Sequence, residues 1–127
     1  RAVALGGGWT LREDQGRVRL LPPVPRDSEG TDLCFGLWRI RSELPVQVRT
    51  AGPGERLGNT PVRERLRAAG VPAWARPYHP IVQRGTRLWL VGVYLLSPPT
   101  PDGGTNVDAM PMVGLSAPAG GALVVRL

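Results

Sequence analysis

The stretch "RLWLVGVYLL", residues 87–96, is apolar at nearly every position, and it decides what kind of fold the chain adopts. A strand that is buried on both faces has this composition, whereas a strand with one solvated face alternates apolar and polar residues. Gly92 lies where a bend or a bulge would fit, because the run is long for a single strand. We therefore predict the main core strand of a β-rich domain over residues 87–96.

Alternating patterns upstream of this run indicate strands with one solvated face. Residues 9–20 read as a hairpin, because apolar and polar residues alternate on both sides of a turn at Asp14-Gln15-Gly16. Further along, Trp38 and Ile40 share one face of a predicted strand, and the arginines that follow each of them share the other. The strands predicted in this region cover residues 33–44 and 45–51.

One helix is predicted within the segment "GNTPVRERLRAAG", residues 58–70. Thr60 is placed to accept a backbone N–H as the N-cap, and Pro61 suits the first helical position. Gly70 suits the left-handed residue that follows the last turn. The helix is therefore expected to begin and end within this segment.

The composition bounds the fold class. The chain of 127 residues has 17 Gly and 14 Pro, which favours short strands and turns over long helices. We predict an α+β fold, a β-rich sandwich-like domain with one or two short helices. Residues 1–44 are expected to be an N-terminal hairpin and strand region packing on the same domain, and residues 45–97 its core. Residues 98–127 read as a Pro/Gly-rich loop to residue 121 and a final strand.

Positive charge is concentrated in the middle of the chain. All 16 basic residues are arginines, the net charge is +6, and ten arginines lie between Arg39 and Arg87 against three glutamates. A concentrated field of one sign favours a polyanionic partner such as nucleic acid. Arginine is also enriched at protein interfaces, so a docking or dimerisation module that uses Trp89 or Tyr94 stays the alternative.

The sequence offers few groups for catalysis. Cys34 is the only cysteine and His79 the only histidine, which excludes an intrachain disulfide and a metal site of several histidines. Cys34 is expected to be a small core residue, and His79 a partly buried or surface one. No motif supports catalysis by these residues alone. The longest apolar run is too short for a bilayer span and no leader-like segment is evident, which favours a soluble, cytoplasmic protein.

The segments "VQVRTAGPGERL" and "PVRERLRAAGVPAWARPYHPIVQRGTRLWLVGVYL" together resemble the C-terminal domain of bacterial tRNA(Ile)-lysidine synthetase, over about residues 45–96. In that family a strand and a Gly-rich loop lead into a basic helix and a "GVPPWLR" corner. Ala73 stands where the family has a second proline. Arg63 fits the first position of the family's basic pair, and Glu64 replaces the second. The residues that fit the corner are Gly70, Val71, Pro72, Trp74, Arg76 and Pro80.

The resemblance implies that this segment belongs to an ATP-dependent tRNA-modifying ligase. Members of the family use ATP and magnesium to adenylate the wobble cytidine of the isoleucine tRNA whose anticodon is CAU, and lysine then displaces AMP. That chemistry belongs to an N-terminal domain with a Ser-Gly-Gly-x-Asp-Ser loop, which these residues lack. Hence no catalytic residue, metal ligand or cofactor is expected here. The implied partners are the tRNA, held at its acceptor stem, and the catalytic N-terminal domain, with a homodimer left open.

Six arginines are predicted to contact RNA, mainly at its phosphates. For Arg76, a phosphate contact and a contact with a protein carbonyl or carboxylate stay equally open. Trp74 is expected to form a rigid corner with Pro72 and Pro80 rather than to stack on a base, because an acceptor stem leaves few bases unstacked. The six arginines are Arg49, Arg56, Arg63, Arg65, Arg67 and Arg76.

Overall fold

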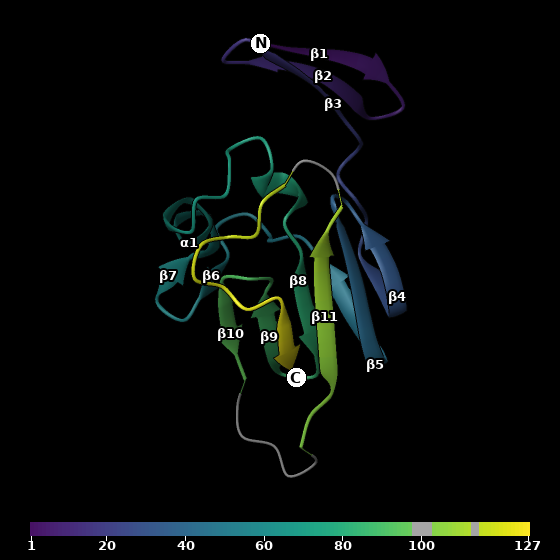
Figure 1. The fold of residues 1–127 in the computed structure, drawn as a ribbon, viewed down its shortest axis with the longest axis vertical. Helices are drawn as coiled ribbons and strands as arrows, with labels where there is room; N and C mark the ends of the chain where they lie inside the picture. The colour runs from purple at the N-terminus through teal and green to yellow at the C-terminus, as the bar shows by residue number, and fades with distance from the viewer. Residues whose placement is uncertain (98–102, 113–114) are drawn as a thin grey trace.

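One long strand, β5 (Trp38–Arg49), organises the main sheet of the computed structural model, which describes residues 1–97, 103–112 and 115–127 (Figure 1). One edge of β5 pairs with β4 (Ser28–Phe35). The other edge is divided, with β11 (Asn106–Pro111) on the first half of β5 and β8 (Ile81–Arg84) on the second. All of these pairings are antiparallel.

Three further strands extend this sheet outward from β8 and β11. The order along the sheet is β10-β9-β8-β5-β11-β12, with β4 on β5, which makes seven strands. The sheet is curled into a half-barrel rather than flat. The added strands are β9 (Arg87–Leu90), β10 (Tyr94–Leu96) and β12 (Val124–Arg126).

The alternation in β5 separates a buried face from a charged one, as the sequence predicts. Trp38 and Ile40 are buried in the core, whereas the arginines that follow them lie on the opposite face. There Arg39 Nη2 lies 3.1 Å from Asp32 Oδ2, and Arg41 Nε lies 3.9 Å from the same oxygen. The hydrogen bond from Arg39 lowers the pKa of the exposed Asp32 carboxyl.

The apolar run over residues 87–96 is two strands, so the prediction of one core strand is wrong. Gly92 adopts φ +70°, and the amide of Val93 donates to the carbonyl of Leu90 at 2.9 Å, which closes a tight turn. The two strands then pair from Tyr94↔Leu90 to Leu96↔Leu88. The β9 half is packed in the core, and the end of β10 is exposed.

A separate three-stranded sheet forms the N-terminal end of the molecule (Figure 1). It contains the predicted hairpin, β2 (Trp9–Asp14) and β3 (Arg17–Leu21), and a strand that was not predicted, β1 (Ala2–Gly6). Leu21 and the chain that follows it attach this sheet to the rest of the protein. The side chain of Leu21 is buried in the core, and Tyr78 Oη donates to the carbonyl of Pro22 at 2.5 Å.

The helix α1 (Val62–Ala68) begins later than predicted. Pro61 occupies the N-cap position without a side-chain cap, because Thr60 is held in the short strand β7 (Thr60–Pro61) that pairs with β6 (Arg56–Leu57). The predicted helix end is confirmed, since Gly70 adopts φ +81°. A single turn of 3₁₀ helix, η1 (Arg76–Tyr78), follows the corner.

The α+β assignment is wrong, because 50% of the described residues are in strands and only 8% are helical. Gly70 and Pro72 stop α1 after seven residues, which is too short to form a helical layer. The sheet is also a curled half-barrel and not a sandwich. The strand β11 lies within the region predicted as an irregular loop, of which residues 98–102 and 113–114 are outside the described residues.

Candidate functional site

The segment from Arg49 to Pro80 contains all the residues that the sequence predicts for the site. At the start of this segment, Arg49 makes a bidentate ion pair with Glu55, with Nη1–Oε1 at 2.7 Å and Nη2–Oε2 at 2.8 Å. The Gly52 amide also donates to Glu55 Oε1 at 2.8 Å. The hydrogen bond from Arg49 lowers the pKa of the Glu55 carboxyl, even though partial burial opposes the shift. Arg49 therefore holds the loop between β5 and β6.

Arg65 ties α1 to two other elements. Its Nε and Nη2 atoms donate to the carbonyl of Leu57 in β6 at 3.1 and 2.8 Å. Its guanidinium carbon lies 3.8 Å from the centroid of the Tyr94 ring in β10, a cation–π contact. The N–H donors of this guanidinium and its planar face therefore both contact groups within the protein.

Arg76 is the residue for which two roles are left open by the sequence. Its Nε atom donates to the carbonyl of Val71 at 3.0 Å, so the contact with a protein carbonyl is present. The bond spans the corner and fixes the chain between α1 and η1. Arg49, Arg65 and Arg76 are called the tethered arginines below, because the side chain of each bonds to a residue 6, 8 or 5 positions away in the same segment.

The corner itself is packed as expected around Trp74 and Pro80. Trp74 is only 8% exposed and belongs to the core cluster formed with Leu66 and Val71, and Pro80 is buried. Pro72 is on the surface, but its carbonyl accepts the amide of Ala75 at 2.9 Å. The prediction that Trp74 packs in the core is confirmed.

The remaining three predicted arginines are exposed, and we call Arg56, Arg63 and Arg67 the outer arginines. The side chain of Arg63 makes no hydrogen bond or ion pair within the described part of the chain. Arg67 Nη2 lies 3.6 Å from Glu64 Oε2, with both side chains mostly exposed, and such pairs are weak. Arg56 Nη1 donates to the carbonyl of Asn59 at 3.1 Å within the β6–β7 hairpin, which leads directly into α1.

His79 and Cys34 are placed differently from the sequence-based expectations. His79 is 3% exposed, its ring lies edge-on to Trp38 at 5.4 Å between centroids, and Nε2 is 2.7 Å from the carbonyl of Val91. Because a carbonyl only accepts, Nε2 carries the proton. Burial lowers the pKa of His79 to about 4. Cys34 follows Leu33 in β4, and its side chain lies on the solvent face of the strand. Cys34 is therefore exposed rather than in the core.

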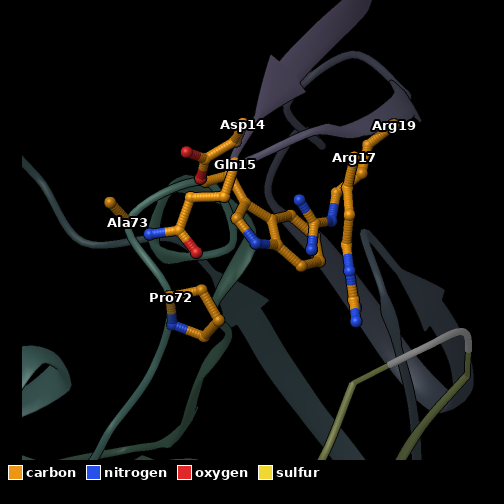
Figure 2. A pocket seen from close by; sticks show the side chains of 7 residues that line it. Asp14, Gln15, Arg17, Arg19, Pro72 and Ala73 are labelled. Atoms are coloured by element: carbon orange, nitrogen blue, oxygen red, sulfur yellow. The ribbon is translucent and has the colours of Figure 1, made fainter.

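Sequence reasoning missed a cleft between the β2–β3 hairpin and the corner (Figure 2). The guanidinium carbon of Arg19 lies 4.4 Å from the centroid of the Trp74 ring, and Arg17 is two residues earlier on the same face of β3. The sequence signal is the alternation in "RVR", but Trp74 is distant in sequence and its proximity could not be predicted. The cavity of about 590 Å³ is lined by Asp14, Gln15, Arg17, Arg19, Pro72, Ala73 and Trp74.

Neither a metal centre nor a membrane-spanning helix is found in the parts of the chain that the structure describes. No three His, Cys, Asp or Glu side chains lie close enough there to hold a metal ion. No helix within residues 1–97, 103–112 and 115–127 is long and apolar enough to cross a bilayer. Comparisons of the chain with family models, with curated proteins and with solved structures each found no match.

Proposed function

We propose that this chain is a tRNA-binding domain of the kind found at the C-terminal end of bacterial tRNA(Ile)-lysidine synthetases. It holds the acceptor stem of the isoleucine tRNA with the anticodon CAU through the outer arginines. A separate N-terminal domain uses ATP and magnesium to attach lysine to the wobble cytidine, in the cytoplasm.

The observation that carries the proposal is the exposure of Arg56, Arg63 and Arg67 on one continuous segment. Arg63 and Arg67 are one helical turn apart, so they share a face of α1. Exposed guanidiniums with weak or no carboxylate partners keep their donors available for phosphate oxygens. An A-form stem presents phosphates and 2′-hydroxyls in a regular arrangement, and such a surface recognises the shape of that arrangement.

The tethered arginines support the same proposal in a different way. Arg49 fixes the β5–β6 loop, Arg65 fixes the helix on β6, and Arg76 fixes the corner. A surface that is rigid before binding loses less conformational entropy when it orders on a ligand. Thus the tethered arginines position the outer ones and are not themselves phosphate contacts in this proposal.

The test is a binding titration of the chain against the CAU isoleucine tRNA and its isolated acceptor-stem hairpin at two salt concentrations. Arg63→Gln and Arg67→Gln are each expected to weaken binding to both RNAs. Arg26→Gln, at an exposed arginine outside this segment, is the matched control for net charge. Absence of binding at low salt, or an equal loss in Arg26→Gln, would contradict the proposal.

A second candidate function, dimerisation without direct RNA contact, is favoured by the outer face of the β1–β3 sheet. Val3, Leu11, Val18 and Leu20 share this face, and their exposed fractions are 43, 37, 63 and 58%. Arg1 and Glu13 lie at one end of it and line a cavity of about 160 Å³ with three of these residues.

This dimerisation surface replaces the one expected around Trp89 or Tyr94, because Trp89 is 2% exposed and the ring of Tyr94 is covered by the guanidinium of Arg65. Light scattering over a range of protein concentrations tests it. Self-association that Val18→Glu abolishes, together with no RNA binding, would favour this second function. A monomer at all concentrations would exclude it.

A further inference from the structure

The cleft beside the corner has two walls that are each held in place by the fold. The β2–β3 wall ends in a tight turn in which Gln15 has φ 50° and Gly16 has φ 76°. The opposite wall is anchored because Trp74 is buried and Ala75 N bonds to Pro72 O. The volume of the cleft, about 590 Å³, is in the range of pockets that bind small molecules.

The groups that line the cleft are mainly hydrogen-bond donors. Figure 2 shows the side chains of Arg17 and Arg19 leaving β3 close together and ending in guanidinium groups that point in different directions, and the amide of Gln15 extending toward Pro72 and Ala73. Neither Arg17 nor Arg19 has an ion-pair partner among the described residues. Asp14 is the one carboxylate of the lining, and it forms no ion pair within 4.0 Å although it is opposite Arg17 in the sheet register.

The contact with Trp74 orients one of these guanidiniums. Arg19 lies over the indole ring, at 4.4 Å from its centroid, so the plane of its donors is constrained by a buried side chain. Arg12 is directly opposite Arg19 in the register and adds a third positive charge to this face of the sheet. Three positive charges against the single carboxylate of Asp14 leave this face with an excess of positive charge, which favours an anionic ligand.

We propose that this cleft binds a phosphate monoester. Each guanidinium offers two parallel donors to a pair of oxygens, and two guanidiniums together suit a dianion with three terminal oxygens. A carboxylate has two oxygens and one charge, and a phosphodiester has two terminal oxygens and one charge, so each engages only one of the two arginines fully. The monoester is carried by a free mononucleotide or by the 5′ end of a nucleic acid. The site does not depend on the outer arginines.

The first test is an NMR titration of the complete chain with inorganic phosphate, methyl phosphate and dimethyl phosphate at constant ionic strength. Phosphate and methyl phosphate are expected to give saturable shifts of the Gly16 and Arg17 amides and of the Trp74 indole N–H. Dimethyl phosphate, a diester, is expected to bind at least about tenfold more weakly, because one charged hydrogen-bonded pair is lost. Equal binding of the diester, or no saturation by phosphate, would overturn the proposal.

The variants locate the site and guard against misfolding. Arg17→Gln and Arg19→Gln are each expected to weaken phosphate binding by about tenfold or more. Arg63→Gln removes the same charge from the outer face of α1 and is expected to leave phosphate binding unchanged. Arg17 is exposed, so its replacement should leave the fold intact even if that of Arg19 does not. Equal losses in Arg17→Gln and Arg63→Gln would mean only general charge screening, and would overturn the site.

Two further ligands separate the sources of the phosphate. An oligoribonucleotide with a 5′-phosphate that binds more tightly than both its 5′-hydroxyl form and a mononucleotide would identify a nucleic-acid end. Equal affinities for the mononucleotide and the 5′-phosphorylated oligonucleotide would identify a free phosphate compound. Because Arg17→Gln leaves the outer arginines intact, failure of this site and failure of the proposed acceptor-stem contact are distinguished by the same set of variants.

Discussion

The inner and outer sides of the segment from Arg49 to Pro80 use the same residue type in opposite ways. On the inner side, Arg65 donates twice to one carbonyl and covers the ring of Tyr94. On the outer side, Arg63, two residues earlier on the same helix, has no partner among the described residues. Local net charge therefore does not locate a binding surface, because part of that charge is used to hold the fold.

The largest loss of stability is expected from a substitution on the inner side, at the corner. Trp74→Ala removes a buried indole and the ring that Arg19 covers, and should lower the free energy of unfolding by about 3 to 5 kcal/mol. Trp9→Ala, at a tryptophan that is 43% exposed, is the control and should cost much less. Urea unfolding measures both. A Trp74→Ala protein of unchanged stability that has lost RNA binding would show that the indole contacts the ligand instead.

Acid should act on the inner side through the buried imidazole. The folded protein keeps His79 neutral, with its pKa lowered to about 4 from the ordinary 6.5, so the unfolded chain binds the proton first. Stability is therefore highest above pH 6.5 and falls as the pH drops to 4, by about 3 kcal/mol.

The single histidine makes this prediction direct to measure, because only one imidazole signal titrates in the NMR spectrum. His79→Leu should flatten the dependence of stability on pH between 6.5 and 4. Asp32 and Glu55, whose pKa values are lowered from 3.8 and 4.5, begin to lose their contributions near those ordinary values, so any slope that remains in this variant is expected at the acidic end of the window. An imidazole that titrates near 6.5 would contradict the buried placement.

Within α1, Arg65 and Arg63 allow the most direct comparison of how the two sides contribute to stability. Arg65→Ala should destabilise the protein by about 1 to 3 kcal/mol, because it removes two hydrogen bonds to Leu57 and the contact with Tyr94. Arg63→Ala should change stability by no more than about 0.5 kcal/mol. Thermal unfolding of the two variants under the same conditions measures both changes in stability. Equal losses would remove the distinction between the two sides.

The smallest effects on stability should accompany the clearest effects on binding. Arg63→Ala and Arg67→Ala are each expected to reduce the slope of log affinity against log salt by roughly 0.7 to 0.9, one phosphate contact per residue. Under conditions where it is folded, Arg65→Ala should keep the wild-type slope. Titrations of tRNA at several salt concentrations give these slopes. Unchanged slopes in both outer variants would mean that RNA, if bound, lies elsewhere.

The local features of this fold could be read from the sequence. The turn at Gln15 and Gly16, the left-handed Gly70 and the alternation from Trp38 to Arg41 each depend on neighbours along the chain, and each is found in the structure. The predicted core position of Trp74 is also found, but that prediction rests on the expected acceptor-stem partner, which leaves few bases unstacked for a ring to stack on.

The errors have a common cause, because they depend on which elements pair or pack with one another. An apolar run with a central glycine fits one bulged strand or two strands, and only the pairing of β8 with β9 and of β9 with β10 decides between them. The strand β11 has just two buried residues, Val107 and Ala109, and is stabilised by the edge of β5. Similarly, the tethering of Arg65 depends on a carbonyl and a ring from two other elements.

The divided edge of β5 also has a consequence for how the chain folds as it is made. The first half of β5 pairs with β11, which follows it only after the β6–β7 hairpin, the helix, the corner and three further strands. Until the ribosome has released Asn106–Pro111, the backbone from Trp38 to Ser42 has one open edge beside a large apolar face. Open strand edges bind other chains. The open edge of β5 therefore exposes the nascent chain to aggregation until β11 emerges, and chaperone protection matters in that interval.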